Sequence, residues 1–182
     1  DRLLVLPGDN NDFIRANVVE NKVYVAKGRM IYQVDFAASK DNWPQWEITG
    51  LLDNERITCF AVQGKDVQGE DTQRKEMVAG TSCGSLWKYR QSGWHKLDQK
   101  VGNVKNLAIA GGKIVYTMEH NNFTNLYEWA GASSVLLAEN VGQFQLHKMG
   151  LYWFDLSSRR VRAPEKKFES ERLQKSVALV IE

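Results

Sequence analysis

The feature that most constrains the fold of this chain is a recurring strand opening. Four short apolar segments begin near Ile14, Ile57, Val104 and Phe144. Successive openings therefore lie roughly 40 to 47 residues apart, a spacing that marks repeated units of several strands each. A chain with such a repeat is expected to fold as a series of similar units, each packed against its neighbours.

The order of elements inside each unit also recurs. A first apolar strand is followed by a turn and by further strand-like segments that contain an apolar–aromatic pair. Ile31–Tyr32, Leu86–Trp87 and Leu126–Tyr127 occupy equivalent places in the first three units, and Arg160–Val161 stands there in the shorter fourth unit. The units are therefore interpreted as diverged copies of one another.

The composition of the segments indicates strands rather than helices. Runs rich in Val, Ile, Tyr, Phe and Trp are separated by clusters of Gly, Asn, Asp and Ser, which is typical of strands joined by turns. Ile57–Val62 and Lys113–Tyr116 are apolar on both faces, as expected for a sheet that packs between two others. We predict an all-β, β-propeller-like fold of about four blades, each with three to four antiparallel strands; a β-sandwich or an irregular barrel is the alternative.

The length of the chain suits a single domain. A chain of 182 residues can bury one self-sufficient core. We predict one domain over residues 1–182, and its expected repeat units cover residues 13–50, 57–98, 104–138 and 144–164.

Both ends carry apolar runs outside these units. Leu3–Leu6 and Val177–Ile181 are short and rich in strand formers. We expect segments 1–7 and 176–182 to pair and close the ring, because an open ring would leave exposed sheet edges. Between the fourth unit and the last run, Pro164–Ser176 predicts a short C-terminal helix or a charged connection.

The charge balance excludes strong global attraction to polyanions. The chain has 24 Lys and Arg against 22 Asp and Glu, a net charge of +2. We therefore do not expect nucleic acid as a partner. No apolar run approaches the roughly 18 residues that span a bilayer, so we expect a soluble chain with no membrane span, and the sequence as given has no targeting segment. Cys59 and Cys83 are too few for a disulfide framework and are expected to be free thiols.

Two segments resemble known propeller repeats. Lys22–Gly50, with its strand, its apolar–Tyr pair and its Asp41, Asn42 and Trp43 segment, resembles a repeat of the tachylectin-2 family of sugar-binding propellers. Val78–Leu97 is similar to the blades of bacterial sensor and Asp-box propellers. Both resemblances imply the propeller fold. The first also implies a sugar site in which Trp43 stacks on the sugar while Asp41 and Asn42 bind its hydroxyl groups.

No motif points to catalysis, a metal or a cofactor. His95, His120 and His147 lie in different units without the close spacing or the Cys and carboxylate neighbours of metal ligands. No phosphate-binding loop or nucleophile motif occurs. We therefore expect a protein that is not an enzyme and has no cofactor. A catalytic site assembled from distant strands is the third hypothesis for function, because local sequence patterns do not reveal such a site.

Two tryptophans in a polar context are the main binding candidates. An exposed Trp is a common anchor for a protein partner or a sugar face. Trp46 begins an outer strand, so we expect it to pack between units. For Trp43, an exposed position and a packed one both stay open. Asp41 and Asn42 complete the candidate site.

A basic cluster lies at the end of the fourth unit and just beyond it. Its members are Arg159, Arg160, Arg162, Lys166 and Lys167. Acidic residues are interleaved with them, which is typical of a solvated face, and an acidic protein partner is the alternative. Because no catalytic group is recognisable, we predict a noncatalytic module that binds another protein through its loops. A glycan-binding lectin is the second hypothesis.

Overall fold

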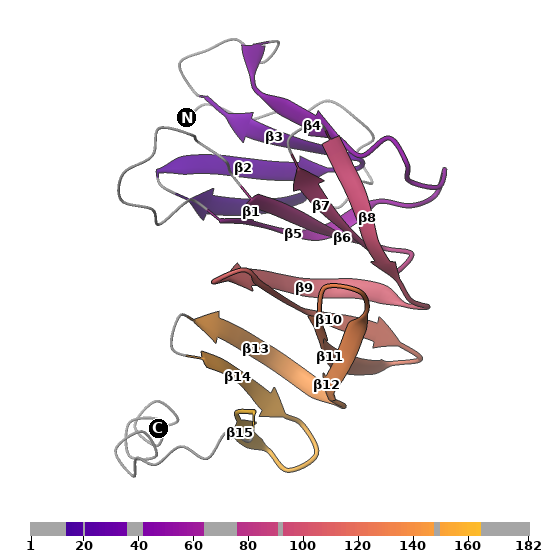
Figure 1. Cartoon of the computed structure of the whole chain (residues 1–182), viewed down its shortest axis with the longest axis vertical. Helices are drawn as coiled ribbons and strands as arrows, with labels where there is room; N and C mark the ends of the chain where they lie inside the picture. Colours follow the sequence, from indigo (N-terminus) through magenta and orange to yellow (C-terminus); the bar gives the residue numbers. More distant parts are fainter. Residues whose placement is uncertain are drawn as a thin grey trace.

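The computed structural model describes residues 14–19, 21–35, 42–63, 76–90, 93–147 and 150–164. These residues form β-strands and the turns between them, with no α-helix in the described ranges (Figure 1). The terminal segments 1–7 and 176–182 lie outside the described residues, as does all of Pro164–Ser176 except Pro164.

The described strands form four antiparallel sheets. The first sheet contains β1 (Ile14–Val19), β2 (Lys22–Lys27), β3 (Met30–Val34) and β4 (Gln45–Glu47). The second contains β5 (Ile57–Gln63), β6 (Glu76–Thr81), β7 (Ser85–Arg90) and β8 (Gly93–Gln99). The third contains β9 (Asn103–Ala110), β10 (Lys113–His120), β11 (Phe123–Trp129) and β12 (Ser134–Ala138). The fourth contains β13 (Val141–His147), β14 (Gly150–Asp155) and β15 (Arg160–Arg162).

The predicted all-β class and its four sheets of three to four strands are confirmed. Each sheet is an antiparallel meander in which sequential strands are neighbours. The predicted openings Ile14, Ile57, Val104 and Phe144 fall in β1, β5, β9 and β13, the first strand of each sheet. The recurring apolar–aromatic pairs fall in the third strands.

The sheets follow one another along the molecule in a blade-like stack. Figure 1 shows the first sheet at one end and the fourth sheet at the other. Neighbouring sheets meet through their first strands, because β1 contacts β5, β5 contacts β9 and β9 contacts β13. The predicted closure of a ring by the two ends of the chain concerns segments outside the described residues.

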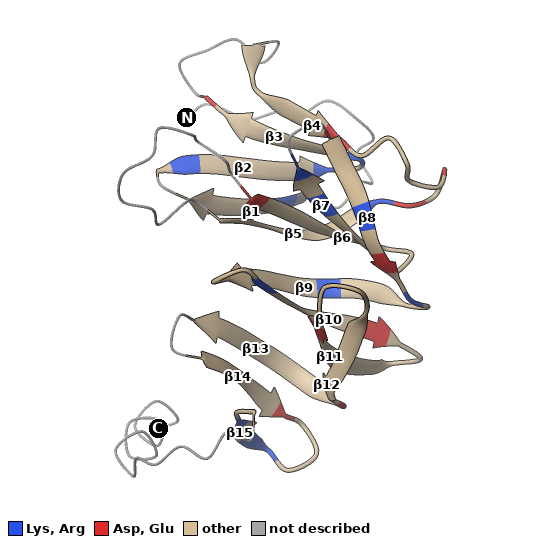
Figure 2. Ribbon diagram, in the orientation of Figure 1, with Lys and Arg blue, Asp and Glu red and all other residues tan. Residues whose placement is uncertain are grey.

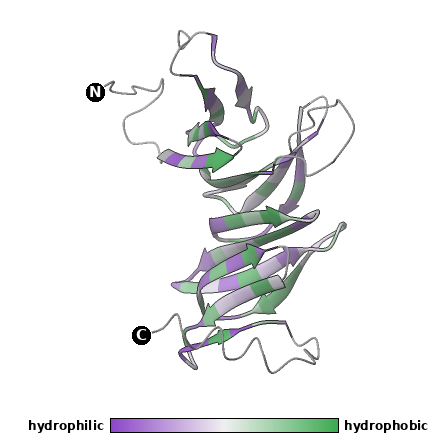
Figure 3. Ribbon diagram, turned by 90° about the vertical axis from the view of Figure 1, so that its left-hand side faces the viewer, coloured by the Kyte–Doolittle hydropathy of each residue, from purple (hydrophilic) through white to green (hydrophobic). Residues whose placement is uncertain are grey.

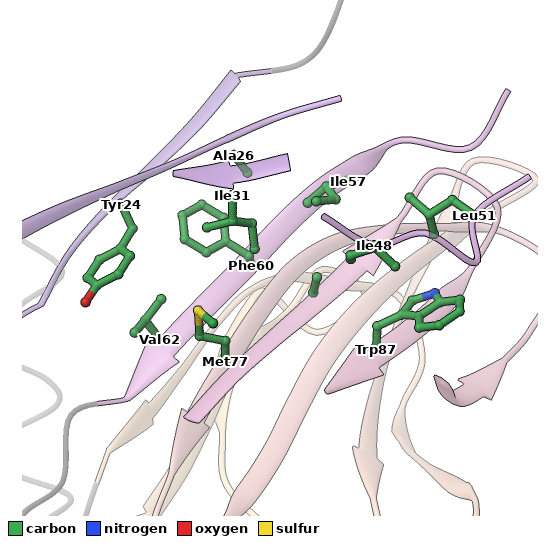
Figure 4. Packing of buried hydrophobic residues seen from close by; sticks show 11 residues of the cluster. Tyr24, Ala26, Ile31, Ile48, Leu51, Ile57, Phe60, Val62, Met77 and Trp87 are labelled. Carbon is green, nitrogen blue, oxygen red and sulfur yellow. The ribbon is translucent and has the colours of Figure 1, made fainter. Parts of the chain in front are cut away.

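A large apolar cluster joins the first two sheets (Figure 4). Ile31 from β3 and Met77 from β6 are 0% and 1% exposed. Burial of each large apolar side chain stabilises the fold by about 1.5–3 kcal/mol. The other buried members are Tyr24, Ala26, Ile48, Leu51, Ile57, Phe60, Val62, Ala79 and Trp87.

Similar clusters join the later sheets. Between the second and third sheets, Val78 and Leu86 pack against Val104 and Tyr116. The backbone approach is close here, since a Cβ atom on Gly80 would lie 2.4 Å from Cγ1 of Val104. Figure 3 shows hydrophobic segments on strands of all four sheets, as expected when apolar residues fill the spaces between sheets.

Polar contacts also join the second and third sheets. The buried hydroxyl of Thr58 on β5 donates a hydrogen bond to the carbonyl of Val104 on β9. At the outer strands, the backbone amide of Ser134 donates to a carboxylate oxygen of Asp98 at 3.1 Å. The first bond ties β9 to β5, which both contribute to the groove described next, and the second ties β12 to β8.

Candidate binding groove

The first strands of all four sheets line a groove of about 700 Å³. In Figure 1, β1, β5, β9 and β13 lie one below the other along one side of the stack. Each of them is the terminal strand of its sheet, so one backbone edge is not paired within the described sheets. We call this feature the inner-strand groove. Its polar lining side chains are Arg15, Lys105, Asn106, Gln143, Gln145 and His147.

Strand β13 supplies half of these polar side chains because its residues alternate. Gln143, Gln145 and His147 are exposed, whereas Phe144 and Leu146 between them pack against the core cluster of the third and fourth sheets. Side chains at alternate positions of a strand point to opposite faces. The sequence of β13 therefore secures the strand on its apolar face and presents amide groups on the other.

The charged groups that line the groove are basic. Arg15 comes from β1 and Lys105 from β9, and the lining contains no Asp or Glu among the described residues. Figure 2 shows the basic segment on β9. The ammonium of Lys105 lies 2.6 Å from a carboxylate oxygen of Glu119 on β10, and the two side chains are 42% and 38% exposed. Glu119 thus offsets part of the positive charge of Lys105.

Cys59 also lines the groove, but its thiol is expected to be unreactive. Burial raises the pKa of this thiol to about 12, so it is protonated at neutral pH. Its Sγ lies 3.7 Å from the carbonyl oxygen of Val104, which accepts a weak hydrogen bond. A protonated, buried thiol is a poor nucleophile. Cys59 and the half-buried Cys83 are both free thiols, as predicted.

The sequence-predicted tryptophans do not line the groove. Trp43 is 6% exposed and clusters with Val25, Tyr32 and Val34. Its indole Nε1–H donates to the carbonyl of Asp35 at 2.7 Å. Of the two alternatives that the sequence leaves open for Trp43, the packed one is therefore correct, and an exposed stacking ring at this position is ruled out.

Trp46 packs between the first two sheets, which confirms the prediction for this residue. Its ring centroid lies 6.3 Å from that of Tyr24 in its own sheet and 6.4 Å from that of Tyr89 in the second sheet. Asn42 is exposed, and Asp41 lies outside the described residues. Of the three described candidates, Asn42 is exposed, Trp43 is buried and Trp46 packs between sheets, so these three do not form one exposed site.

Three members of the predicted basic cluster are described. Arg159 lies in the turn before β15, and Arg160 and Arg162 are exposed on that strand. The Nε atom of Arg162 lies 3.5 Å from a carboxylate oxygen of Asp155. Lys166 and Lys167 lie outside the described residues. None of the three described arginines lines the groove.

The histidines lie on three different strands. His95 is on β8, His120 ends β10 and His147 ends β13, and of these His147 alone lines the groove. Among the residues that the structure describes, no three His, Cys, Asp or Glu side chains gather as metal ligands would. The described part of the chain also has no helix with the length and apolar character needed to cross a membrane.

The groove residues Arg15, Lys105, Gln143 and Gln145 were not candidates in the sequence. They are polar positions of three of the four repeated first strands, β1, β9 and β13, and no local motif sets them apart. The fold and groove define a class: an all-β repeat protein whose sheets share a polar groove. Searches of protein-family models and of curated proteins give no match to the chain.

Proposed function

We propose that this chain is a noncatalytic binding module that holds a protein partner in the inner-strand groove. The observation that carries the proposal is the position of the groove, which crosses the first strands of all four sheets. A partner segment bound there would contact every repeat at once. The sequence suggested loops as the binding face, whereas the groove offers a surface built on regular strands.

The lining of the groove suits a polar partner segment. Its amide side chains, Asn106, Gln143 and Gln145, both donate and accept hydrogen bonds. A volume of about 700 Å³ lies within the range of specific binding clefts. The strands that carry these groups are anchored by core clusters, so little backbone ordering would oppose binding.

The two other hypotheses have less support. A lectin site needs an exposed aromatic ring, and the ring proposed for this role, Trp43, is buried. The aromatic residues along the groove, Phe60 and Phe144, belong to core clusters. General acid–base catalysis most often uses a His, commonly together with a carboxylate, and the described groove lining has His147 but no carboxylate beside it. Protein binding is therefore the function that the geometry supports best.

The test fills the groove without adding charge. Ala16 is exposed on β1 and lines the groove, so Ala16→Trp places a large side chain inside it. With the wild-type chain as bait in source extract, mass spectrometry identifies the captured proteins. We expect Ala16→Trp to reduce the recovery of a specific partner by about tenfold, equivalent to about 1.4 kcal/mol of binding free energy.

A matched control separates this effect from nonspecific stickiness. Ala130 is exposed in the turn after β11 and does not line the groove. Ala130→Trp adds the same side chain there and should retain the partner at the wild-type level. Equal recovery with both variants would contradict the assignment of the groove as the binding site.

A further inference from the structure

Resting on the function proposed above, we propose that the inner-strand groove recognises an extended, acidic peptide segment of its partner. The distribution of charge is the first observation. Two basic side chains, Arg15 and Lys105, line the groove from different sheets, and the described lining supplies no carboxylate. Carboxylate groups of a partner are the complementary charges, and they accept the strongest hydrogen bonds from guanidinium and ammonium donors.

The second observation is the periodicity of β13. Gln143, Gln145 and His147 occupy alternate positions and are exposed toward solvent. Alternate side chains on a strand are spaced by about 6.7 Å, and the same spacing separates alternate residues of an extended peptide. The two amides and the imidazole at this interval match the repeat of an extended main chain, and a Gln side chain can bond both the amide and the carbonyl of a peptide unit.

The unpaired edges of the first strands favour the same ligand. Since β1, β5, β9 and β13 are all terminal strands, each has backbone amides and carbonyls that no strand partner within the described sheets uses. Peptides recognised in extended form bond to such edges, and side-chain contacts then supply the specificity. The groove thus offers strand edges and Gln side chains that can bond to a peptide backbone. It also offers cationic groups that can bind the acidic side chains of the peptide.

A nucleic acid strand fits these observations less well. Single-strand binding uses many Lys and Arg side chains along the backbone, together with aromatic rings on which the bases stack. Two basic side chains line the groove, far fewer than a strand of phosphates would need, and Lys105 pairs with Glu119. Phe60 and Phe144 are engaged in core clusters. A short acidic peptide requires only a few cations, which is what this groove provides.

The ion pair between Lys105 and Glu119 provides a sharp test. Because Glu119 competes with a ligand carboxylate for the Lys105 ammonium, Glu119→Gln should strengthen binding of an acidic peptide. Lys105→Glu reverses the charge in the groove and should weaken it. An increase in affinity cannot result from misfolding, so Glu119→Gln keeps the test informative even if Lys105→Glu folds poorly.

The probe is a fluorescein-labelled peptide of about ten residues in which Glu and Ser alternate, long enough to extend along the whole of β13. Fluorescence anisotropy with the full chain measures its dissociation constant. We expect saturable binding that weakens as salt is added, a loss of about tenfold or more in Lys105→Glu, and a several-fold gain in Glu119→Gln. Arg90→Glu, the same kind of charge reversal at an exposed end of β7 outside the groove, should bind like the wild type.

Three controls identify the ligand chemistry. A peptide of alternating Gln and Ser should bind much more weakly, and equal binding would overturn the role of the carboxylates. A single-stranded oligothymidylate that bound more tightly than the acidic peptide would overturn the choice of ligand. The two proposals can fail separately. If Ala16→Trp abolished capture of the partner, but the acidic peptide neither bound the wild-type chain nor competed with the partner, the groove would still be the binding site. The inference of an acidic segment would then be wrong.

Discussion

Glu55 is a carboxylate almost completely buried in the segment between the first and second sheets. It is 1% exposed, and its oxygens accept hydrogen bonds from the hydroxyl of Thr81 and from the backbone amide of Leu52. Burial by itself acts to raise the pKa of this carboxyl, but the hydrogen bonds outweigh burial and hold the pKa below its ordinary value of 4.5. Ionised Glu55 therefore favours the folded chain.

This arrangement predicts a pH-dependent stability. Because the pKa of Glu55 is lower in the folded chain than in the unfolded chain, its ionisation stabilises the fold above about pH 4.5, and that stabilisation is lost as the pH falls through the folded-state pKa. We expect Glu55→Gln to lower the free energy of unfolding by about 1–3 kcal/mol at pH 7. The difference from the wild type should shrink between pH 4.5 and more acidic values.

Urea unfolding at a series of pH values measures this difference. Glu139→Gln, at an exposed position after β12, is the matched control and should track the wild type throughout. A gap between Glu55→Gln and the wild type that stayed constant down to pH 3 would mean that ionisation of Glu55 does not stabilise the fold.

For Trp43, the sequence does not decide whether the side chain is exposed or buried. Its near neighbours in the chain are polar, so local composition predicts neither exposure nor burial. The residues that bury it, Val25, Tyr32 and Val34, come from β2 and β3, and its indole bonds the carbonyl of Asp35. Only the pairing of those strands brings these groups together, and a resemblance over one segment does not supply that information.

At the level of strands, the third strand of each of the first three sheets carries an apolar residue that packs toward the following sheet. In the first three sheets this residue is Ile31, Leu86 or Leu126, and each is at most 1% exposed. In the fourth sheet, Val161 pairs with Phe154 and is 37% exposed. The packing between successive sheets therefore depends on these positions in the first three sheets, whereas Val161 has less packing to lose.

Truncating these apolar side chains to Ala should lower the free energy of unfolding by unequal amounts. Leu126→Ala removes a side chain that is 0% exposed and belongs to the core between the third and fourth sheets, so we expect a loss of about 2–4 kcal/mol. Val161→Ala should cost less than about 1 kcal/mol, since burial sets the loss. Leu136→Ala, the same substitution at a residue that is 44% exposed on β12, is the matched control.

Urea unfolding monitored by tryptophan fluorescence compares the three variants. If Leu126→Ala lowered the free energy of unfolding no more than Leu136→Ala does, the result would contradict the packing of the fourth sheet on the third.

The opening of the second unit could be predicted because the residues of β5 are buried on both faces of the strand and leave a continuous apolar run over Ile57–Gln63. The boundary of the fourth unit is less accurate for a physical reason. Strand β13 begins at Val141, three positions before the predicted opening Phe144, and its pairing with β14 shifts register between these two residues. A bulge of this kind interrupts the alternation on which sequence interpretation relies.

At the level of the whole molecule, the groove could not be predicted from local patterns. Arg15, Lys105 and Gln145 lie on three different first strands and share no motif. Hydrophobic periodicity identifies residues of the core, while polar residues on the same strands look like ordinary solvated positions. They form one site only because three successive sheet interfaces stack the first strands side by side.

Photo-crosslinking tests the central claim, that a protein partner binds in the inner-strand groove, most directly. In one version of the chain, p-benzoylphenylalanine replaces Gln145 in the groove. In a second version it replaces Ser133, which is exposed in the turn between β11 and β12. Irradiation in the presence of the captured partner should yield a crosslinked product from position 145 and none from position 133. A product from position 133 alone, with the partner still retained, would place the binding surface elsewhere and contradict the account.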